Sequence, residues 1–86
     1  MPAMKVTVWS IPNCVQCMMT KREMDKLGII YEAADLTDPA NEAQLEAFKA
    51  QGLIQAPIVT TDIKVWSGFQ VGKIRSLASY LMGERK

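Results

Sequence analysis

Both cysteines of this 86-residue chain lie in the segment WSIPNCVQCMM, residues 9–19, and the expected structure depends on what surrounds them. Cys14 and Cys17 are separated by two residues. A pair with this spacing can form a structural disulfide, supply half of a metal site, or act as a redox centre that cycles between dithiol and disulfide. The elements on either side of the pair distinguish these three alternatives.

The residues around the pair predict a strand followed by a helix. Residues 5–9, KVTVW, alternate and are β-branched or aromatic, which is typical of a strand. The IPN sequence that follows interrupts this pattern with turn-forming residues. Helix formers dominate residues 15–27, and Gly28 is placed to end the helix. Residues 29–35, IIYEAAD, predict a second strand.

The next segment, LTDPANEAQLEAFKAQG, predicts a second helix. Thr37 or Asp38 is the expected N-cap, and Pro39 suits the first turn because its fixed φ angle matches a helix. Gly52 is the expected C-terminal stop. The apolar face of this helix depends mainly on Leu45 and Phe48, together with several alanines.

The last third of the chain predicts a β-hairpin and a third helix. Residues 57–60 and 63–66 form the expected strands, with a turn near Asp62. After SGF, the spacing of an amphipathic helix is followed by Ile74, Leu77, Ala78 and Leu81. The element order is therefore β-α-β-α-β-β-α. The first two strands should be parallel, because a helix connects them, and the simplest assembly is an α/β fold with a four-stranded mixed sheet.

The composition fits one small domain, residues 1–86. A chain of this length buries roughly 60–65% of its unfolded surface, enough for a core but not for a second module. The formal net charge of +1, without a basic run, gives no electrostatic signature for nucleic acid or anionic lipid. No apolar run of about 20 residues is present, and residues 1–12 lack the pattern of a signal peptide. We expect a cytoplasmic monomer.

The position of the cysteines at a strand-to-helix junction favours redox chemistry. Cys14 is expected in the first helical turn, where unpaired N–H groups and the helix dipole stabilise a thiolate, the form that attacks disulfides. One helix face is formed by Cys17, Thr20, Met24 and Leu27. Because this face should point inward, we expect Cys17 to be shielded and Cys14 exposed. Cys14 is then the attacking thiol, and Cys17 the thiol that resolves the mixed disulfide.

The other interpretations of the pair fit less well. Structural zinc needs four nitrogen or sulfur ligands, whereas the chain has two cysteines and no histidine, and an iron–sulfur cluster meets the same shortage. A metal would require a dimer or outside ligands. A disulfide across two residues closes a very small loop and constrains the unfolded chain little. Two inert buried cysteines remain a further alternative. We expect no metal and no cofactor.

Three separated motifs resemble those of the NrdH-redoxins, small glutaredoxin-like members of the thioredoxin superfamily. They are CVQC at 14–17, QAPIV at 55–59 and WSGF at 66–69. The resemblance covers nearly the whole chain in element order, and it implies a thioredoxin-like fold of the glutaredoxin type. It also implies a small dithiol–disulfide oxidoreductase that thioredoxin reductase recharges and that donates electrons to class Ib ribonucleotide reductase or another disulfide-bearing protein.

By the same resemblance, Pro57 is a cis-proline that faces the redox centre. A cis X–Pro bond costs only about 0.5–1 kcal/mol, and Ala56 can offer backbone groups to a bound peptide strand. Trp66 and Phe69 are expected either to form an apolar platform for partner proteins or to pack in the core. The substrate-binding residues implied in this way are Pro12, Val15, Gln16, Ala56, Pro57, Trp66, Ser67, Gly68 and Phe69.

The sequence departs from the family pattern in two places. Many members continue WSGF with Arg-Pro-Asp, whereas Gln70, Val71 and Gly72 follow here, so the arginine and any charge network that it forms are missing. Met18 and Met19 stand where polar or small residues are usual. Met18 is expected near the surface, where it either widens an apolar contact patch or packs along the helix. These departures bear on the identity of the partner.

Two rival functions stay open. A conventional glutaredoxin would use glutathione, whose two carboxylates need well-placed cations and helix-end N–H groups. The segment SGFQVGK, residues 67–73, offers one cation, Lys73. A non-catalytic binding module, a metal-bridged dimer included, would keep its partner after Cys14→Ser and would carry metal when purified.

Overall fold

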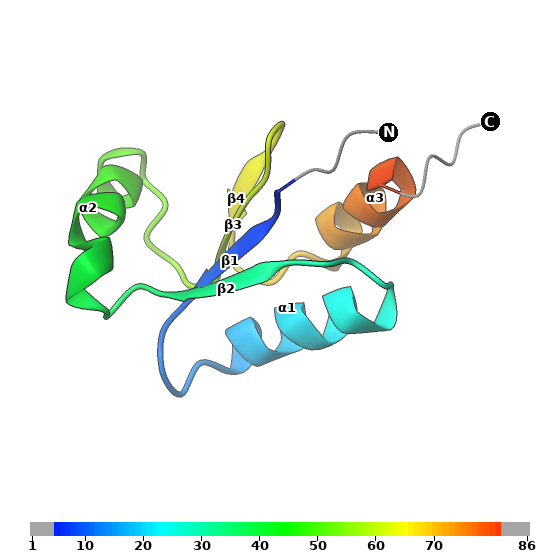
Figure 1. The fold of residues 1–86 in the computed structure, drawn as a ribbon, viewed down its shortest axis with the longest axis horizontal. Helices are drawn as coiled ribbons and strands as arrows, with labels where there is room; N and C mark the ends of the chain where they lie inside the picture. Colours follow the sequence, from blue (N-terminus) through cyan, green and yellow to red (C-terminus); the bar gives the residue numbers. More distant parts are fainter. Residues whose placement is uncertain (1–4, 82–86) are drawn as a thin grey trace.

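The computed structural model describes residues 5–81, and its ribbon shows strands and helices in the predicted order (Figure 1). The elements are β1 (Thr7–Ser10), α1 (Val15–Lys26), β2 (Glu32–Asp35), the 3₁₀ turn η1 (Pro39–Asn41), α2 (Glu42–Ala50), β3 (Ile58–Thr60), β4 (Val65–Ser67) and α3 (Val71–Leu81). The strands form one sheet in the order β2-β1-β3-β4. The predicted four-stranded mixed sheet is therefore confirmed, and the fold is thioredoxin-like, of the glutaredoxin type.

The register of the sheet places the carboxyl ends of β1 and β2 at the same edge. These two strands are parallel, with Thr7 opposite Glu32 and Ser10 opposite Asp35. β3 runs antiparallel to β1, and β4 runs antiparallel to β3. The chain leaves β1 at this edge and enters α1, so the cysteine pair lies at one end of the sheet.

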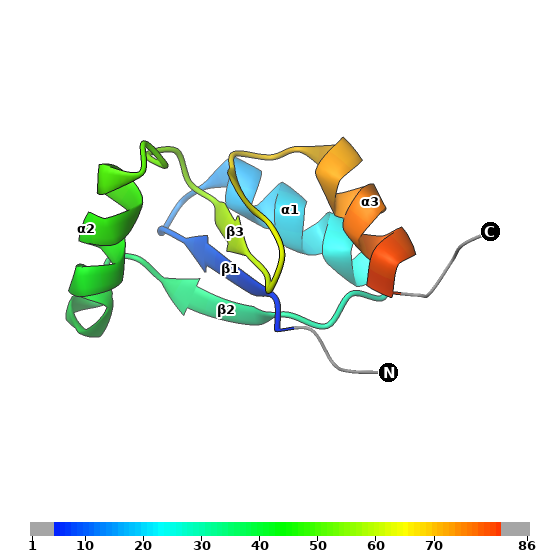
Figure 2. The ribbon, with the colours of Figure 1, turned by 90° about the horizontal axis from the view of Figure 1, so that it is seen from above.

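The helices cover the two faces of the sheet unequally. α1 and α3 lie side by side on one face (Figure 2). The core between them and the sheet consists of Val6, Val8, Met24, Ile29, Val59, Trp66, Ile74, Leu77 and Ala78. α2 packs through Phe48 on the other face, near the carboxyl ends of β1 and β2 (Figure 1). None of the helices in residues 5–81 combines the length and apolar character needed to cross a bilayer.

α1 and α2 end in the same way, and this ending corrects the predicted start of β2. In α1, the N–H of Gly28 donates to Asp25 and the N–H of Ile29 donates to Met24, the pair of bonds of a Schellman motif. Gly28 has a φ of 76°, which glycine adopts without a steric penalty. Ile29 is buried against Met24 as part of the helix end. β2 consequently begins at Glu32 instead of at residue 29.

The second Schellman motif ends α2 and joins it to the sheet. The N–H of Gly52 donates to Lys49, and the N–H of Leu53 donates to Phe48. Leu53 and Phe48 belong to the same apolar cluster, so the helix end is closed by packing as well as by hydrogen bonds. Gly52 therefore acts as the predicted stop.

Other boundaries differ by a few residues from those expected. Asp38 caps a 3₁₀ turn, because its Oδ1 accepts the N–H of Ala40 at 3.0 Å, and α2 proper begins only at Glu42. β4 starts two residues later than predicted because Thr61 organises the preceding turn. Its Oγ1 accepts the N–H of Lys64 at 2.8 Å.

Phe48 is expected to contribute most of the anchorage of α2. Its ring is 2% exposed and meets Trp9 edge to face, with the ring centroids 5.4 Å apart. Phe48→Ala should lower the free energy of unfolding by about 3–5 kcal/mol through the lost burial and the cavity left behind. Urea unfolding measures this loss, and Phe48→Leu gives a smaller loss if the alanine variant does not fold.

Tyr80→Ala provides the matched control, since it removes an aromatic ring that is 60% exposed on α3. Its free energy of unfolding should change by no more than about 0.5 kcal/mol. A loss below about 1 kcal/mol for Phe48→Ala would show that α2 is not held by this ring.

Candidate redox site

Cys14 is the N-cap residue of α1, one position earlier than the first-turn placement expected from the sequence. Its backbone is extended, with φ −107° and ψ 110°, and its Sγ accepts the N–H of Cys17 at 3.1 Å. A sulfur atom thus takes the position that a serine or aspartate oxygen usually fills at a helix start. No acidic residue lies in the first turn of α1, so no carboxylate there opposes a negative charge on this sulfur.

The two cysteines form a disulfide, with their Cα atoms 5.2 Å apart. Cys17 is 3% exposed, and its buried face continues through Thr20 and Met24. Cys14 is half-buried and is the more accessible of the two. A reagent in solution therefore meets the sulfur of Cys14 first, whereas Cys17 is covered by the body of the protein.

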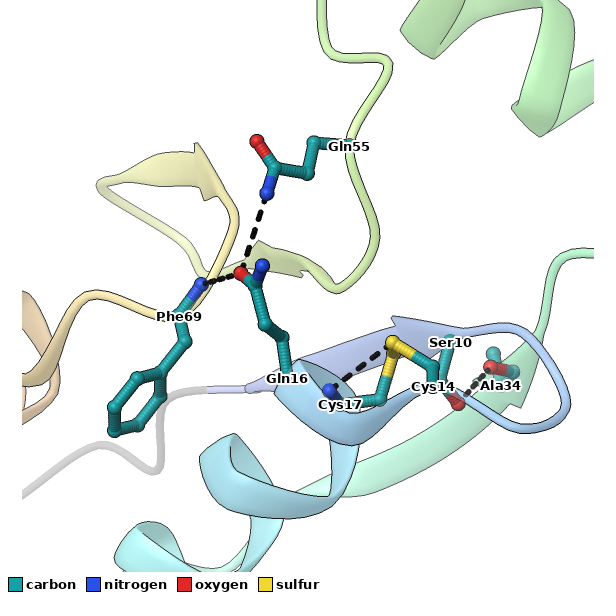
Figure 3. The surroundings of a disulfide bond; sticks show 7 residues. All are labelled: Ser10, Cys14, Gln16, Cys17, Ala34, Gln55 and Phe69. Carbon is teal, nitrogen blue, oxygen red and sulfur yellow. Dashed lines mark hydrogen bonds between the residues drawn. A yellow bond between two sulfur atoms is a disulfide. The ribbon is translucent and has the colours of Figure 1, made fainter.

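Gln16, between the cysteines, joins α1 to two distant loops (Figure 3). Its Oε1 accepts the backbone N–H of Phe69 at 2.9 Å and the side-chain Nε2 of Gln55 at 3.3 Å. Gly68 lies next to this junction, where an added Cβ would stand 3.6 Å from the Gln16 Oε1. The segments around 55 and 69 are thereby brought beside the disulfide, as the three motifs predict.

The loop before β3 contains the expected cis peptide bond, between Ala56 and Pro57. The carbonyl of Pro57 accepts the N–H of Gly68 at 2.7 Å, which ties this loop to the one after β4. Pro57 is itself fully buried, and Ala56 is half-buried. Ala56 is therefore the residue of the pair that solvent reaches.

Of the two alternatives left open for Trp66, the structure has core packing. Trp66 is 3% exposed and packs in the core with the strands, α1 and α3, because its side chain points to the helix-covered face of β4. Phe69 is half-buried and packs against the same core, which agrees with the packing alternative. Ser67 is half-buried and Gly68 is buried, so this motif contributes mainly backbone groups to the site.

Several residues close to Cys14 in the chain carry exposed apolar side chains. Val15 is 69% exposed and Met18 is 58% exposed, which confirms the surface position expected for Met18. Ile11 is 43% exposed, and Pro12 beside it is also exposed. Sequence reasoning missed Ile11 and Gln55. Gln55 opens the QAPIV motif, but its role was not predicted because the residue that it contacts, Gln16, is 39 positions away.

The carboxyl ends of β1 and β2 border a cavity of about 320 Å³, lined by Ser10, Ile11, Pro12, Lys21, Ala33, Ala34 and Asp35. Asp35 Oδ1 accepts the backbone N–H of Thr37 at 2.8 Å and its hydroxyl at 2.6 Å. These hydrogen bonds, together with the charge of Lys21, hold the pKa of Asp35 below its usual value. The carboxylate therefore stays ionised near neutral pH and does not donate a proton there.

Within residues 5–81, no group of three or more histidine, cysteine, aspartate or glutamate side chains is arranged to hold a metal ion. The cysteine pair thus has no neighbouring protein ligands that would complete a tetrahedral site.

Gln16→Leu is expected to release the loop at Phe69, because it removes the acceptor and leaves an N–H unpaired. Amide hydrogen exchange at Phe69 should accelerate about tenfold or more, corresponding to roughly 1.4 kcal/mol or more of lost protection. Gln16→Glu keeps an acceptor oxygen and should preserve the protection.

Gln70→Leu is the control, because within residues 5–81 the side chain of Gln70 bonds only to its own loop, at the Ser67 carbonyl 2.8 Å away. It should leave exchange at Phe69 near that of the unaltered protein. Equal acceleration in the Gln16 and Gln70 variants would contradict a specific role for Gln16.

Comparisons with known proteins agree with this geometry. Residues 6–66 match the Glutaredoxin family model. The chain is 39% identical over 74 residues to the glutaredoxin-like protein NrdH of Escherichia coli K12, covering 86% of this chain and 89% of that protein. It is 30% identical over 73 residues to the NrdH protein of Lactococcus lactis subsp. lactis, covering 85% and 99% of the two chains.

A solved structure of the NrdH-redoxin from Escherichia coli superposes with a TM-score of 0.77 and 36% identity, covering 85% of this chain and 93% of that one. The structure of the thioredoxin-like protein BC3987 gives a TM-score of 0.71 at 27% identity, with 85% and 99% covered. The chain therefore belongs to the glutaredoxin family, in its NrdH-redoxin group, and is a thiol–disulfide oxidoreductase.

Proposed function

We propose that this protein is a single-domain dithiol carrier in which Cys14 attacks and Cys17 resolves. The observation that supports these roles is the difference in exposure across one disulfide: Cys14 is half-buried at the helix start, whereas Cys17 is 3% exposed. The N–H of Cys17 at 3.1 Å from the Cys14 Sγ would also stabilise a Cys14 thiolate.

In the forward reaction, the Cys14 thiolate attacks one sulfur of a client disulfide, and the other client sulfur leaves as a thiolate that takes a proton. The Cys17 sulfur, deprotonated, then attacks Cys14 in the mixed disulfide. The Cys14–Cys17 bond forms, and the second client sulfur leaves as a thiol. Two electrons pass to the client, and the protein finishes in the disulfide form found here.

The partners follow from the resemblance to NrdH proteins. The protein would be recharged by thioredoxin reductase and would reduce class Ib ribonucleotide reductase or another disulfide-bearing protein in the cytoplasm. The Escherichia coli relative has a "thioredoxin-like activity profile". This supports thioredoxin reductase over glutathione as the electron source. The client would pair with the backbone of Ala56 and contact the exposed side chains of Pro12 and Val15.

A glutathione-dependent reaction is the rival, and the loop after β4 disfavours it. Glutathione carboxylates would need free N–H donors and cations near Cys14. The N–H of Phe69 is already bonded to Gln16 at 2.9 Å, and the one cation of residues 67–73 is the exposed Lys73. The loop therefore offers little to bind an anionic tripeptide.

Reduction of insulin disulfides with NADPH separates the two electron sources. One arm contains thioredoxin reductase, and the other contains glutathione with glutathione reductase. NADPH should be consumed rapidly in the first arm and only at background rate in the second. Turnover confined to the glutathione arm would refute the proposal. If neither arm turns over and the purified protein carries stoichiometric metal, a metal-bridged binding module would be favoured instead.

Trapping of a client tests the two cysteine roles. Cys17→Ser should accumulate a mixed disulfide between Cys14 and the client, because no second thiol is present to resolve it. Cys14→Ser should trap almost none, because the remaining sulfur is buried. Non-reducing gels with insulin or ribonucleotide reductase measure both variants, and the reverse pattern would exchange the roles.

A further inference from the structure

Thr20 carries a buried hydroxyl that the disulfide form leaves without a partner. The residue is 0% exposed, and within residues 5–81 no hydrogen-bond partner is in reach of its Oγ1. Threonine in the middle of a helix usually bonds to the carbonyl four residues earlier or faces solvent, and this one does neither. A buried unpaired hydroxyl lowers stability, so its presence calls for a physical explanation.

The helical spacing places Thr20 next to Cys17 on the buried face of α1. Thr20 follows Cys17 by three residues on α1, and both belong to the buried face of that helix. Residues at this spacing are direct neighbours on a helix surface. Helical side chains also lean toward the N-terminus, which directs Thr20 toward the turn that contains Cys17.

We propose that the Thr20 hydroxyl donates a hydrogen bond to the sulfur of Cys17 when the pair is reduced. A disulfide sulfur is a weak acceptor, whereas the sulfur of a reduced Cys17 accepts a hydrogen bond as a thiol and accepts it most strongly as the thiolate that attacks Cys14. When the bond to Cys14 is broken, the Cys17 sulfur becomes an acceptor that solvent does not reach. This inference rests on the proposed role of Cys17 as the buried resolving thiol.

Each sulfur then has its own donor from α1. The N–H of Cys17 serves Cys14 at 3.1 Å, and the hydroxyl of Thr20 serves Cys17. Because the second bond exists only in the dithiol, it stabilises the reduced form relative to the disulfide. Reduction by dithiothreitol breaks the Cys14–Cys17 bond, adds two electrons and two protons, and converts the reagent to its cyclic disulfide. Thr20 shifts this equilibrium toward the reduced protein.

The equilibrium constant with dithiothreitol tests the inference in the intact protein. Thr20→Val has nearly the shape of threonine but no hydroxyl, and it should make the protein harder to reduce by about tenfold. For a two-electron couple this corresponds to a reduction potential about 30 mV more negative. Thr20→Ser keeps the hydroxyl and should stay within about twofold of the unaltered protein. Thr20→Ala also lacks the hydroxyl, and it should show the same change of about tenfold if the valine variant does not fold.

Urea unfolding of both redox forms excludes a purely structural effect. Thr20→Val should stabilise the disulfide form or leave it unchanged, since it removes an unpaired group, while destabilising the dithiol form. Thr7→Val is the matched control, a buried threonine on β1 whose side chain faces away from α1. It should alter both redox forms equally and leave the potential unchanged.

Two outcomes would overturn the inference: an equilibrium constant for Thr20→Val within twofold of the unaltered protein, or an equal change in the stability of both redox forms. Either result leaves the carrier function standing, provided that the unaltered protein equilibrates with dithiothreitol. A pair that does not cycle at all refutes the proposed function itself.

Discussion

The hydrogen bond from the Cys17 N–H to the Cys14 Sγ is the contact on which the site depends. It makes Cys14 the cap of α1, so the start of the helix and the position of the accessible sulfur are fixed by the same atoms. Three further consequences follow from this start. Gln16 reaches the loop at Phe69, Cys17 faces inward, and Val15 and Met18 remain at the surface. Moving the helix start by one residue would rotate each of these side chains by about 100°.

The features that the sequence predicted are those set by residues close together in the chain. The order of strands and helices follows from alternation and helical spacing, and both glycine stops act through bonds that span at most five residues. The inward face of Cys17 likewise follows from its spacing to Met24. The start of β2 was predicted too early because Ile29 has the composition of a strand residue, although its N–H completes the end of α1.

The features that sequence reasoning missed or left open depend on residues far apart. Gln16 and Phe69 are 53 positions apart, and nothing local to either residue identifies its partner. From sequence alone, Trp66 could line a surface or fill the core. It is buried because α1 and α3 pack against its face of the sheet. The polar groups of the site come from the backbone and from two glutamines, residue types that carry no distinctive chemical signal.

Gln70 shows how this chain orders its loop without the arginine that many relatives have. Its carbonyl accepts the N–H groups of Lys73 and Ile74, both at 3.1 Å, which starts α3, and its Nε2 donates to Ser67. Gln16 holds the other side of the same loop through Phe69. Both attachments are neutral hydrogen bonds, which salt screens far less than an ion pair. The geometry of this loop beside the disulfide should therefore vary little with ionic strength, and salt effects on activity would report on the encounter with a charged partner.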